Sequence, residues 1–343
     1  MGITQQVKFG NTGLKISPII VGCMSYGSKD WHPWIIEDKN EVFKILKTAY
    51  DSGLRTFDTA DGYSNGQSEI LLGEFLKEYE IPRETVIIMT KVWAPVDSSL
   101  EGFQRTGPMN EDQKVHFANQ QGLSRKHIIE ACKNSVRRLG TYIDVYQIHR
   151  ADQDTPMEET MRALNDVVQQ GLTRYIGASS MLGTEFAEYQ FIAEKNGWSK
   201  FVNMQDCYNL LYREEEREMI PYIKKHGIAQ TPWSPLQRGL LSRPVEVSSY
   251  REDNDRVLKG RRLNQYEDFE IEIINRVEQV AVKKGITMAE VATAWLLSKG
   301  TFPILGLNSV QRVKEAIKAL DVTLTEEECK YLEEPYRPKA LIQ

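Results

Sequence analysis

Four residues of this sequence could together deliver a proton. Asp58 and Tyr63 are five positions apart, at and just beyond the end of a short β-rich run, and Lys91 and His149 lie at or near the ends of two later runs. A lysine among apolar neighbours needs a partner such as Asp58. Its cation next to a phenol stabilises the phenolate and draws the phenol pKa down from about 10. The pattern predicts that Tyr63 protonates a carbonyl oxygen while His149 polarises the carbonyl.

Such a site supplies a proton but no electrons, and a nicotinamide hydride is the simplest source of them. Each residue alone has an ordinary explanation. An aspartate often caps a turn, a lysine at a strand end is usually solvated, and one histidine among five is more often a packing residue. The combination of four such residues at strand ends favours the catalytic interpretation.

The elements that would position these residues recur along the whole chain. Short β-rich runs alternate with longer segments of helical period. The runs are 19–23, 56–60, 86–92, 142–149, 174–179, 201–206, 228–234 and 302–307. Amphipathic helices are predicted at 37–53, 124–140, 155–171, 267–284 and 287–299. A β-hairpin is predicted at 7–18, around "GNTG".

Eight strand–helix units predict a (β/α)8 TIM barrel that occupies residues 1–343 as a single domain. An open doubly wound sheet is the alternative, but it needs GxGxxG after its first strand, where this chain has "VGCMSYG". In a barrel, active-site residues come from the C-terminal ends of the strands. The segment 94–122 shows no clear periodicity, and we expect a long loop there, over the barrel mouth.

Composition excludes several classes of function. The net charge of −5 argues against nucleic acid as a partner, and no apolar run is long enough to span a membrane. The five histidines form no HxH pair, which argues against a metal-dependent barrel hydrolase and predicts no metal site. The cysteines lack metal-ligand or CxxC spacing, which favours reduced thiols and a cytoplasmic location. They are Cys23, Cys132, Cys207 and Cys329.

The tetrad, in this order and on these strands, resembles that of the aldo-keto reductase superfamily. So do the segments "FDTADGYSNGQSEILLGEFLK", "GLSRKHIIEACKNSVRRL", "TPMEETMRALNDVVQQGLTRYIGASS" and "TPWSPLQRGLLS". The similarity extends over about residues 7–335. These segments resemble those of the aryl-alcohol-dehydrogenase-like and potassium-channel-β-subunit-like branches more than those of the aldose-reductase branch. The resemblance implies NADPH or NADP+ lying extended across the barrel mouth.

At the nicotinamide end, the resemblance implies that Trp233 stacks on the ring, with Ser179 and Gln205 holding its carboxamide. Ser180 would join them, where many members have asparagine, and Met24 and Asp58 would also border the cofactor. The pyrophosphate would be wrapped by Ser234, Pro235, Leu236 and Arg238.

At the other end, the resemblance implies that Gly306 and Asn308 approach the adenosine phosphate. Arg312 would pair with the 2′-phosphate, Glu315 would meet the adenine, and Arg256 would close over the pyrophosphate. The start of the helix after "GLNS" offers free N–H groups to a phosphate, and an arginine adds a fork of donors. Taken without the resemblance, the pattern favours a solvated helix face formed by Arg312, Lys314 and Lys318 over a phosphate site.

Aromatic residues near the expected mouth could line an apolar substrate pocket. They are Tyr26, Trp31, Trp34, Trp93 and Phe103. The resulting hypothesis is an NADPH-dependent reductase of aromatic or medium aliphatic aldehydes and of ketones. The alternative is a regulatory protein of the same fold that uses bound NADPH as a sensor. The potassium-channel β subunits that this chain resembles carry a different residue at the position of His149, so the complete tetrad favours an enzyme.

Overall fold

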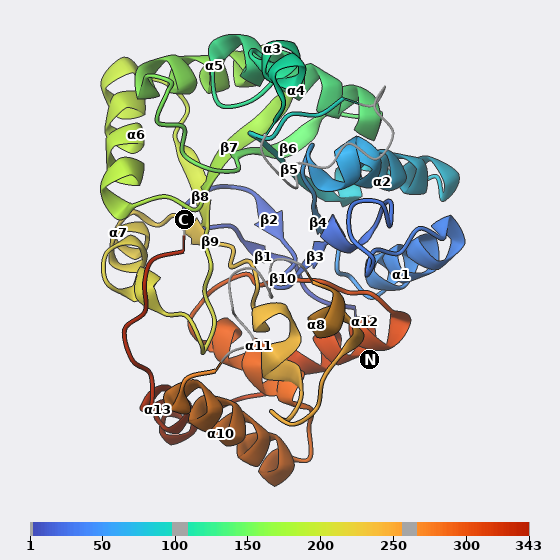
Figure 1. Cartoon of the computed structure of the whole chain (residues 1–343), viewed down its shortest axis with the longest axis vertical. Helices are drawn as coiled ribbons and strands as arrows, with labels where there is room; N and C mark the ends of the chain where they lie inside the picture. The colour runs from blue at the N-terminus through green and yellow to red at the C-terminus, as the bar shows by residue number, and fades with distance from the viewer. Residues whose placement is uncertain (1–2, 98–108, 256–265, 343) are drawn as a thin grey trace.

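The computed structural model describes residues 3–97, 109–255 and 266–342, and within them a sheet of eight parallel strands has the order β10-β3-β4-β5-β6-β7-β8-β9. Its two edges are joined by backbone hydrogen bonds. The Phe302 N–H donates to the Gln230 carbonyl oxygen (2.9 Å) and the Ile304 N–H to that of Pro232 (3.0 Å). The sheet therefore closes into a barrel, with helices packed around its outside (Figure 1). The predicted TIM barrel is confirmed.

All eight barrel strands lie within or overlap the β-rich runs. They are β3 (Ile20–Gly22), β4 (Thr56–Asp58), β5 (Ile87–Val92), β6 (Ile143–Ile148), β7 (Thr173–Ser179), β8 (Phe201–Gln205), β9 (Ala229–Gln230) and β10 (Ile304–Leu305). The helices between them are α1 (Lys39–Asp51), α2 (Gln67–Glu78), α3 (Glu111–Phe117), α4 (Arg125–Leu139), α5 (Met157–Gln169), α6 (Gly183–Asn196) and α7 (Met219–His226). The later helices are α8 (Tyr250–Asn254), α10 (Asp268–Lys284), α11 (Met288–Ser298), α12 (Val310–Ala319) and α13 (Glu326–Glu333).

Helix ends follow local chemistry. At the start of α4 the Ser124 hydroxyl accepts the His127 N–H, and at its end Gly140 takes the left-handed conformation with φ 68°. Glycine adopts that conformation at little cost, so the helix stops there. The two ends were therefore readable from the sequence.

The segment 94–122 contains a helix that the periodicity did not predict. α3 begins after Asn110, whose side chain accepts the Gln113 N–H while the Gln113 side chain reaches back to the Asn110 N–H. This capping box stabilises the first turn of a short helix. The sequence contains this box as Asn-x-x-Gln. Residues 111–117 are helical, so the expectation of a segment without secondary structure was wrong for them.

The barrel interior changes from apolar at its base to polar at its top. Met89 and Val145 lie in the base with Phe9 and Ile16, which come from the hairpin of β1 (Val7–Lys8) and β2 (Lys15–Ile16). The hairpin therefore plugs the N-terminal end of the barrel. Two residues further along β5 and β6 the buried side chains are polar, with Lys91 after Met89 and Gln147 after Val145. The polar end is where the site lies.

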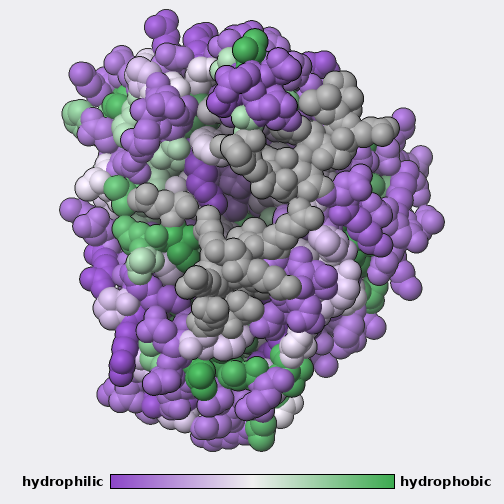
Figure 2. Space-filling view, viewed as in Figure 1, coloured by the Kyte–Doolittle hydropathy of each residue, from purple (hydrophilic) through white to green (hydrophobic). Residues whose placement is uncertain are grey.

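The late helices build a second apolar core beside the barrel. α10, α11 and α13 bury Ile273, Trp295 and Leu332 against the loops that follow β8 and β9, at the lower part of Figure 1. This arrangement brings α11 to the barrel mouth. No helix within the described ranges is long and apolar enough to cross a membrane. The mouth-side face is mainly hydrophilic, with a shaded hollow near its centre (Figure 2).

Candidate active site

The structure brings the four residues of the predicted tetrad together. β4, β5 and β6 are neighbours in the sheet, so Asp58, Lys91 and His149 lie side by side at their C-terminal ends. Lys91 Nζ is 2.5 Å from Asp58 Oδ1 and 3.4 Å from the Tyr63 hydroxyl oxygen. The Tyr63 and His149 rings meet edge to face, with centroids 5.8 Å apart. Tyr63 stands on the short 3-10 turn Tyr63–Gly66 that follows β4.

Lys91 is fully buried and yet charged. Burial lowers the pKa of a lysine, but the Asp58 carboxylate and the Tyr63 phenol outweigh it and raise the Lys91 pKa above its ordinary value. The Thr59 carbonyl oxygen accepts a further bond from Lys91 Nζ at 2.8 Å. A buried cation with three oxygen neighbours is a fixed source of positive potential beside the phenol.

The pKa of Tyr63 is higher than the ordinary tyrosine value, whereas the sequence led us to expect a lower one. Burial raises it above the ordinary tyrosine value, and the opposing influence of Lys91, helped by Arg150, offsets only part of that. Desolvation of the phenolate is the larger effect. Tyr63 is therefore protonated at neutral pH, which is the state that a proton donor needs.

His149 is held neutral. Burial lowers its pKa well below the ordinary histidine value, and the positive charges of Lys91 and Arg150 lower it further. A neutral imidazole next to the phenol can donate one hydrogen bond to a substrate oxygen without carrying charge. The arrangement therefore places a protonated phenol next to a neutral imidazole, two groups that can both donate hydrogen bonds.

A polar network beneath the tetrad fixes Asp58. The side-chain amides of Gln147 and Gln205 donate to its second oxygen at 3.1 and 2.9 Å. The Gln205 side-chain amide also donates to the Gln147 side-chain oxygen Oε1 (3.1 Å), as does that of Asn203 (2.9 Å). Buried carboxylates persist only when such donors satisfy them. Gln147 was missed from the sequence, although the two-residue period of a strand places it on the same face as His149.

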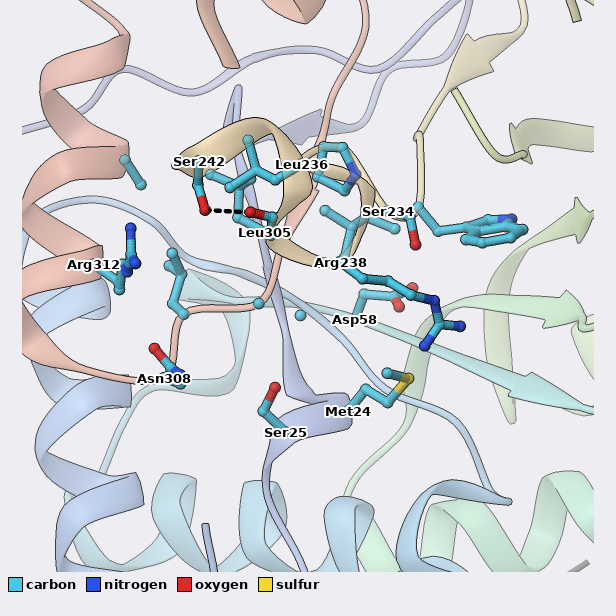
Figure 3. Close-up of a pocket in the computed structure, with 18 of the residues that line it drawn as sticks. Met24, Ser25, Asp58, Ser234, Leu236, Arg238, Ser242, Leu305, Asn308 and Arg312 are labelled. Carbon is cyan, nitrogen blue, oxygen red and sulfur yellow. Dashed lines mark hydrogen bonds between the residues drawn. The ribbon is translucent and has the colours of Figure 1, made fainter. Parts of the chain in front are cut away.

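Asp58, Tyr63 and His149 border a cavity of about 450 Å³ that extends away from them along the barrel mouth, and Lys91 lies beneath its surface. Asp58 and Met24 lie toward one end, and Asn308 and Arg312 lie toward the other (Figure 3). The predicted cofactor residues that line it also include Ser179, Gln205, Trp233, Ser234, Pro235, Leu236, Arg238, Gly306 and Glu315. Residues far apart in the sequence are thus assembled along one elongated recess.

Around Trp233 the backbone and the side chains are both constrained. The indole Nε1–H donates to the Ser180 hydroxyl at 2.9 Å, so Ser180 lies behind Trp233 and is not part of the cavity lining. Ser180, Ser234 and Arg238 have φ of 49°, 51° and 55°. Non-glycine residues in this region store strain and cluster at functional sites. Arg238 is also held by Asp255, at 2.8 Å.

At the far end of the cavity, α12 begins with a cap and a charged pair. The Ser309 hydroxyl accepts the Arg312 N–H at 3.2 Å, and Arg312 Nη1 donates to Glu315 at 3.0 Å. The other first-turn N–H groups have no acceptor within the helix. Together with a half-exposed guanidinium they suit an anion.

The structure moves two expected substrate residues out of the pocket. Tyr26 is buried, with its hydroxyl donating to the Leu307 carbonyl oxygen (2.5 Å), and Trp93 packs against the main core. Neither lines the cavity, whereas Trp31 and Trp34 do. The expected residues Phe103 and Arg256 lie outside the described residues.

Several lining residues were not expected from the sequence. The loop before α1 contributes Ser25 and His32, and α11 contributes Glu290 and Thr293. No local signal marks the α11 residues, because only the packing of the late helices brings them to the mouth. Arg150 follows His149 directly and could have been found from that position. Over the part of the chain that the structure describes, no group of three or more His, Cys, Asp or Glu side chains could hold a metal ion.

Comparisons with known proteins agree with this geometry. Residues 18–337 match the family model described as "Aldo/keto reductase family". The Saccharomyces cerevisiae protein named "Putative aryl-alcohol dehydrogenase AAD16" is 58% identical over 339 residues, covering 99% of both chains. The versiconal hemiacetal acetate reductase of Aspergillus parasiticus is 50% identical over 341 residues, covering 98% of both.

A solved structure supports the same assignment. A thermostable aldo-keto reductase, Tm1743, crystallised with the inhibitor epalrestat, superposes with a TM-score of 0.73 at 26% identity, covering 97% of this chain and 100% of that one. The tetrad geometry, the family match and these relatives lead to one conclusion. The chain belongs to the aldo/keto reductase family, whose members are oxidoreductases acting on carbonyl compounds.

Proposed function

We propose that the protein reduces aldehydes and ketones to alcohols with NADPH, and that Tyr63 is the proton donor. One observation carries the proposal. The buried Lys91 cation, paired with Asp58 at 2.5 Å, lies 3.4 Å from the Tyr63 hydroxyl at one end of the cavity. A phenol so placed can give up its proton because the cation stabilises the phenolate that remains.

The cavity suits an extended dinucleotide. It has an indole and two amide or hydroxyl side chains near the tetrad, and arginines further along and at the far end. Trp233, Ser179 and Gln205 would hold the nicotinamide, Arg238 with its neighbours the pyrophosphate, and Arg312 the adenosine end. Bound there, the nicotinamide supplies the hydride.

The chain's own groups handle the proton. Tyr63 Oη transfers its proton to the carbonyl oxygen as negative charge develops there. The neutral His149 imidazole donates a hydrogen bond to the same oxygen and orients it. Asp58 keeps Lys91 charged, and the amides of Gln147 and Gln205 keep Asp58 in place. The donors are fixed before the reaction, so little reorganisation is needed.

The substrate end is aromatic. Trp31 lies 5.6 Å, ring to ring, from Tyr63, and the His32 and Trp34 rings stack 5.1 Å apart. Aromatic pairs of this kind favour flat, apolar substrates. The names of the relatives, an aryl-alcohol dehydrogenase and a reductase of a hemiacetal acetate, support aromatic or medium aliphatic aldehydes.

The test follows NADPH oxidation at its absorbance band with a panel of aromatic aldehydes, aliphatic aldehydes and ketones. Turnover with aromatic aldehydes, at a rate typical of enzymes of about 1 s⁻¹ or more, is expected. Tight NADPH binding with no turnover on any carbonyl would favour the sensor alternative. Failure to bind NADPH would overturn both.

Reduction should show little pH dependence over a wide range. His149 stays neutral above about 6.5 and Tyr63 stays protonated up to at least about 10, because their pKa values are lowered and raised from those ordinary values. kcat/KM is therefore expected to be flat from about pH 7 to 9 and to fall only as pH rises through the Tyr63 pKa. A profile of steady-state rates checks this. A decline that starts near neutrality would show that another group sets the rate.

Arg312→Ala should weaken NADPH binding by about 10- to 100-fold and leave NADH binding almost unchanged. The 2′-phosphate is the only group that distinguishes the two cofactors, and a forked, charge-assisted pair contributes roughly 1.5–3 kcal/mol. Arg312 must exchange its bond to Glu315 for the phosphate, but a half-exposed pair of this kind is worth little.

Titration of tryptophan fluorescence measures both dissociation constants, and the preference should shrink as salt rises. Lys318→Ala is the matched control, since Lys318 is an exposed cation on the same helix that does not line the cavity. Equal dissociation constants for NADPH and NADH in the unmodified protein would move the cofactor to NADH. The assignment of the tetrad would stand.

A further inference from the structure

We infer that Ser64 and Asn65 are positioning residues for the proton donor, because each ties the turn that carries Tyr63 to a different flanking loop. The inference rests on the proposed role of Tyr63 and goes beyond it. Both residues follow Tyr63 directly in the turn Tyr63–Gly66, and neither lines the cavity. They can therefore affect the reaction only through the groups that they hold.

The backbone of this turn is strained. Ser64 and Asn65 have φ of 48° and 52°, in the left-handed region that non-glycine residues adopt at a cost. Two such residues in succession keep this conformation only where surrounding contacts hold it. The contacts that hold the turn therefore also fix the position from which the Tyr63 side chain reaches the cavity.

On one side the turn is tied to the loop before α1. The Ser28 N–H donates to the hydroxyl oxygen of the buried Ser64 at 3.2 Å. A Cβ on Gly27 would lie 2.2 Å from the same oxygen, so only glycine lets the loop come this close. The same loop carries Trp31, whose ring centroid lies 5.6 Å from that of Tyr63. The loop and the phenol are thus held against one another.

On the other side the turn is tied to the segment after β5. The Asn65 side-chain amide donates to the Asp97 backbone carbonyl oxygen at 2.6 Å, and the Asp97 N–H donates to Asn65 Oδ1 at 2.9 Å. One planar side chain therefore uses both its donor and its acceptor on the two backbone groups of a single residue. Because β5 carries Lys91, this pair of bonds joins the turn that bears the phenol to the strand that bears the cation.

Tyr63 needs such support because its own contact with the cation is long. Its hydroxyl lies 3.4 Å from Lys91 Nζ, beyond the usual range of a hydrogen bond. A contact of this length does not hold the phenol in place, and the stabilisation that the cation gives falls as the distance grows. A displacement of about 1 Å can cost about 100-fold in rate. The two ties therefore keep the phenol within reach of both the cation and the substrate oxygen.

The test replaces each residue by glycine, which adopts the left-handed region without strain, so that the loss of the side chain is not mixed with a change of backbone preference. kcat for aldehyde reduction should fall by about 10- to 100-fold in Ser64→Gly and in Asn65→Gly, while the dissociation constant for NADPH stays almost unchanged. The solvent deuterium isotope effect on kcat should rise, because proton transfer from a misplaced phenol becomes the slow step.

Glu80→Gly is the matched control. Glu80 is an exposed residue with φ of 47°, outside the cavity, so its replacement removes the same kind of backbone strain far from the turn. It should leave kcat, the isotope effect and NADPH binding unchanged.

Hydrogen exchange tests the ties without the reaction. The Ser28 N–H and the amides of the turn should exchange faster in Ser64→Gly, and the Asp97 N–H and the turn should do so in Asn65→Gly. Unchanged exchange in the turn, or kcat within a few-fold of the unmodified protein in both variants, would overturn the inference. NADPH binding that weakens as much as kcat falls would overturn it too and assign the two residues to the cofactor site. Absence of turnover in the unmodified protein would instead overturn the proposed function, and this inference with it.

Discussion

Replacement of Tyr63 by phenylalanine is expected to lower kcat for aldehyde reduction by about 10²- to 10⁴-fold while NADPH still binds. The change removes only the hydroxyl that lies 3.4 Å from Lys91 Nζ. The ring remains and keeps its contacts with Trp31 and His149. The developing alkoxide would then lose the proton donor that we propose for it.

Steady-state turnover measures the loss, and fluorescence titration with NADPH shows whether the cofactor site survives. Tyr79→Phe is a matched control, because Tyr79 has an exposed phenol at the end of α2, outside the cavity. If Tyr63→Phe retained turnover within a few-fold of the unmodified protein, another group would have to be the acid. His149 would be the next candidate by position.

Lys91→Met should be about as damaging, and the losses at this site should not add. Without the cation the Tyr63 phenolate is not stabilised, and burial alone would raise its pKa further. Asp58→Asn should also cause a large loss, because it leaves a buried Lys91 without its partner. Residues that act as one unit give a double variant no worse than the more damaged single variant.

The double variant Tyr63→Phe/Lys91→Met provides the test. A loss equal to the product of the two single losses would contradict a coupled site. Stability must be measured beside activity, since Lys91→Met leaves the Asp58 carboxylate buried without a cation and should lower the unfolding free energy by about 3–5 kcal/mol. Asp58→Asn/Lys91→Met removes both charges and should be more stable than Lys91→Met, which separates folding damage from lost chemistry.

Much of the fold was readable from local signals. Each barrel strand lies within or overlaps a β-rich run. The two ends of α4 follow from Ser124, which caps the first turn, and from Gly140, which takes the left-handed conformation after the last turn. The missed helix α3 was also local, since its capping box is written at Asn110 and Gln113. Hydrophobic periodicity alone does not reveal a helix as short as this one, but a capping-box motif in the sequence does indicate it.

The tetrad was predictable for a different reason. A barrel places the C-terminal ends of all strands at one mouth, so polar residues at strand ends must converge whatever lies between them. The order of the strands then makes Asp58, Lys91 and His149 neighbours. The direction of the Tyr63 pKa was not predictable, because it depends on how much water burial removes from the phenol, and the sequence carries no measure of that.

The sequence by itself therefore determined the barrel and the position of the tetrad at its mouth, because these depend on the period of the strands and on the residues at their ends. Its resemblance to the aldo-keto reductases indicated most of the residues along the recess. Only the tertiary structure decided which of the expected side chains do not border the recess and which unexpected ones do. It buried Tyr26 against Leu307 and set Ser180 behind Trp233. It brought α11 to the mouth and placed Arg150 beside the reacting end. Whether a side chain faces the recess depends on packing between segments that are distant in the chain. Small differences in the position of those segments turn a side chain into the cavity or away from it.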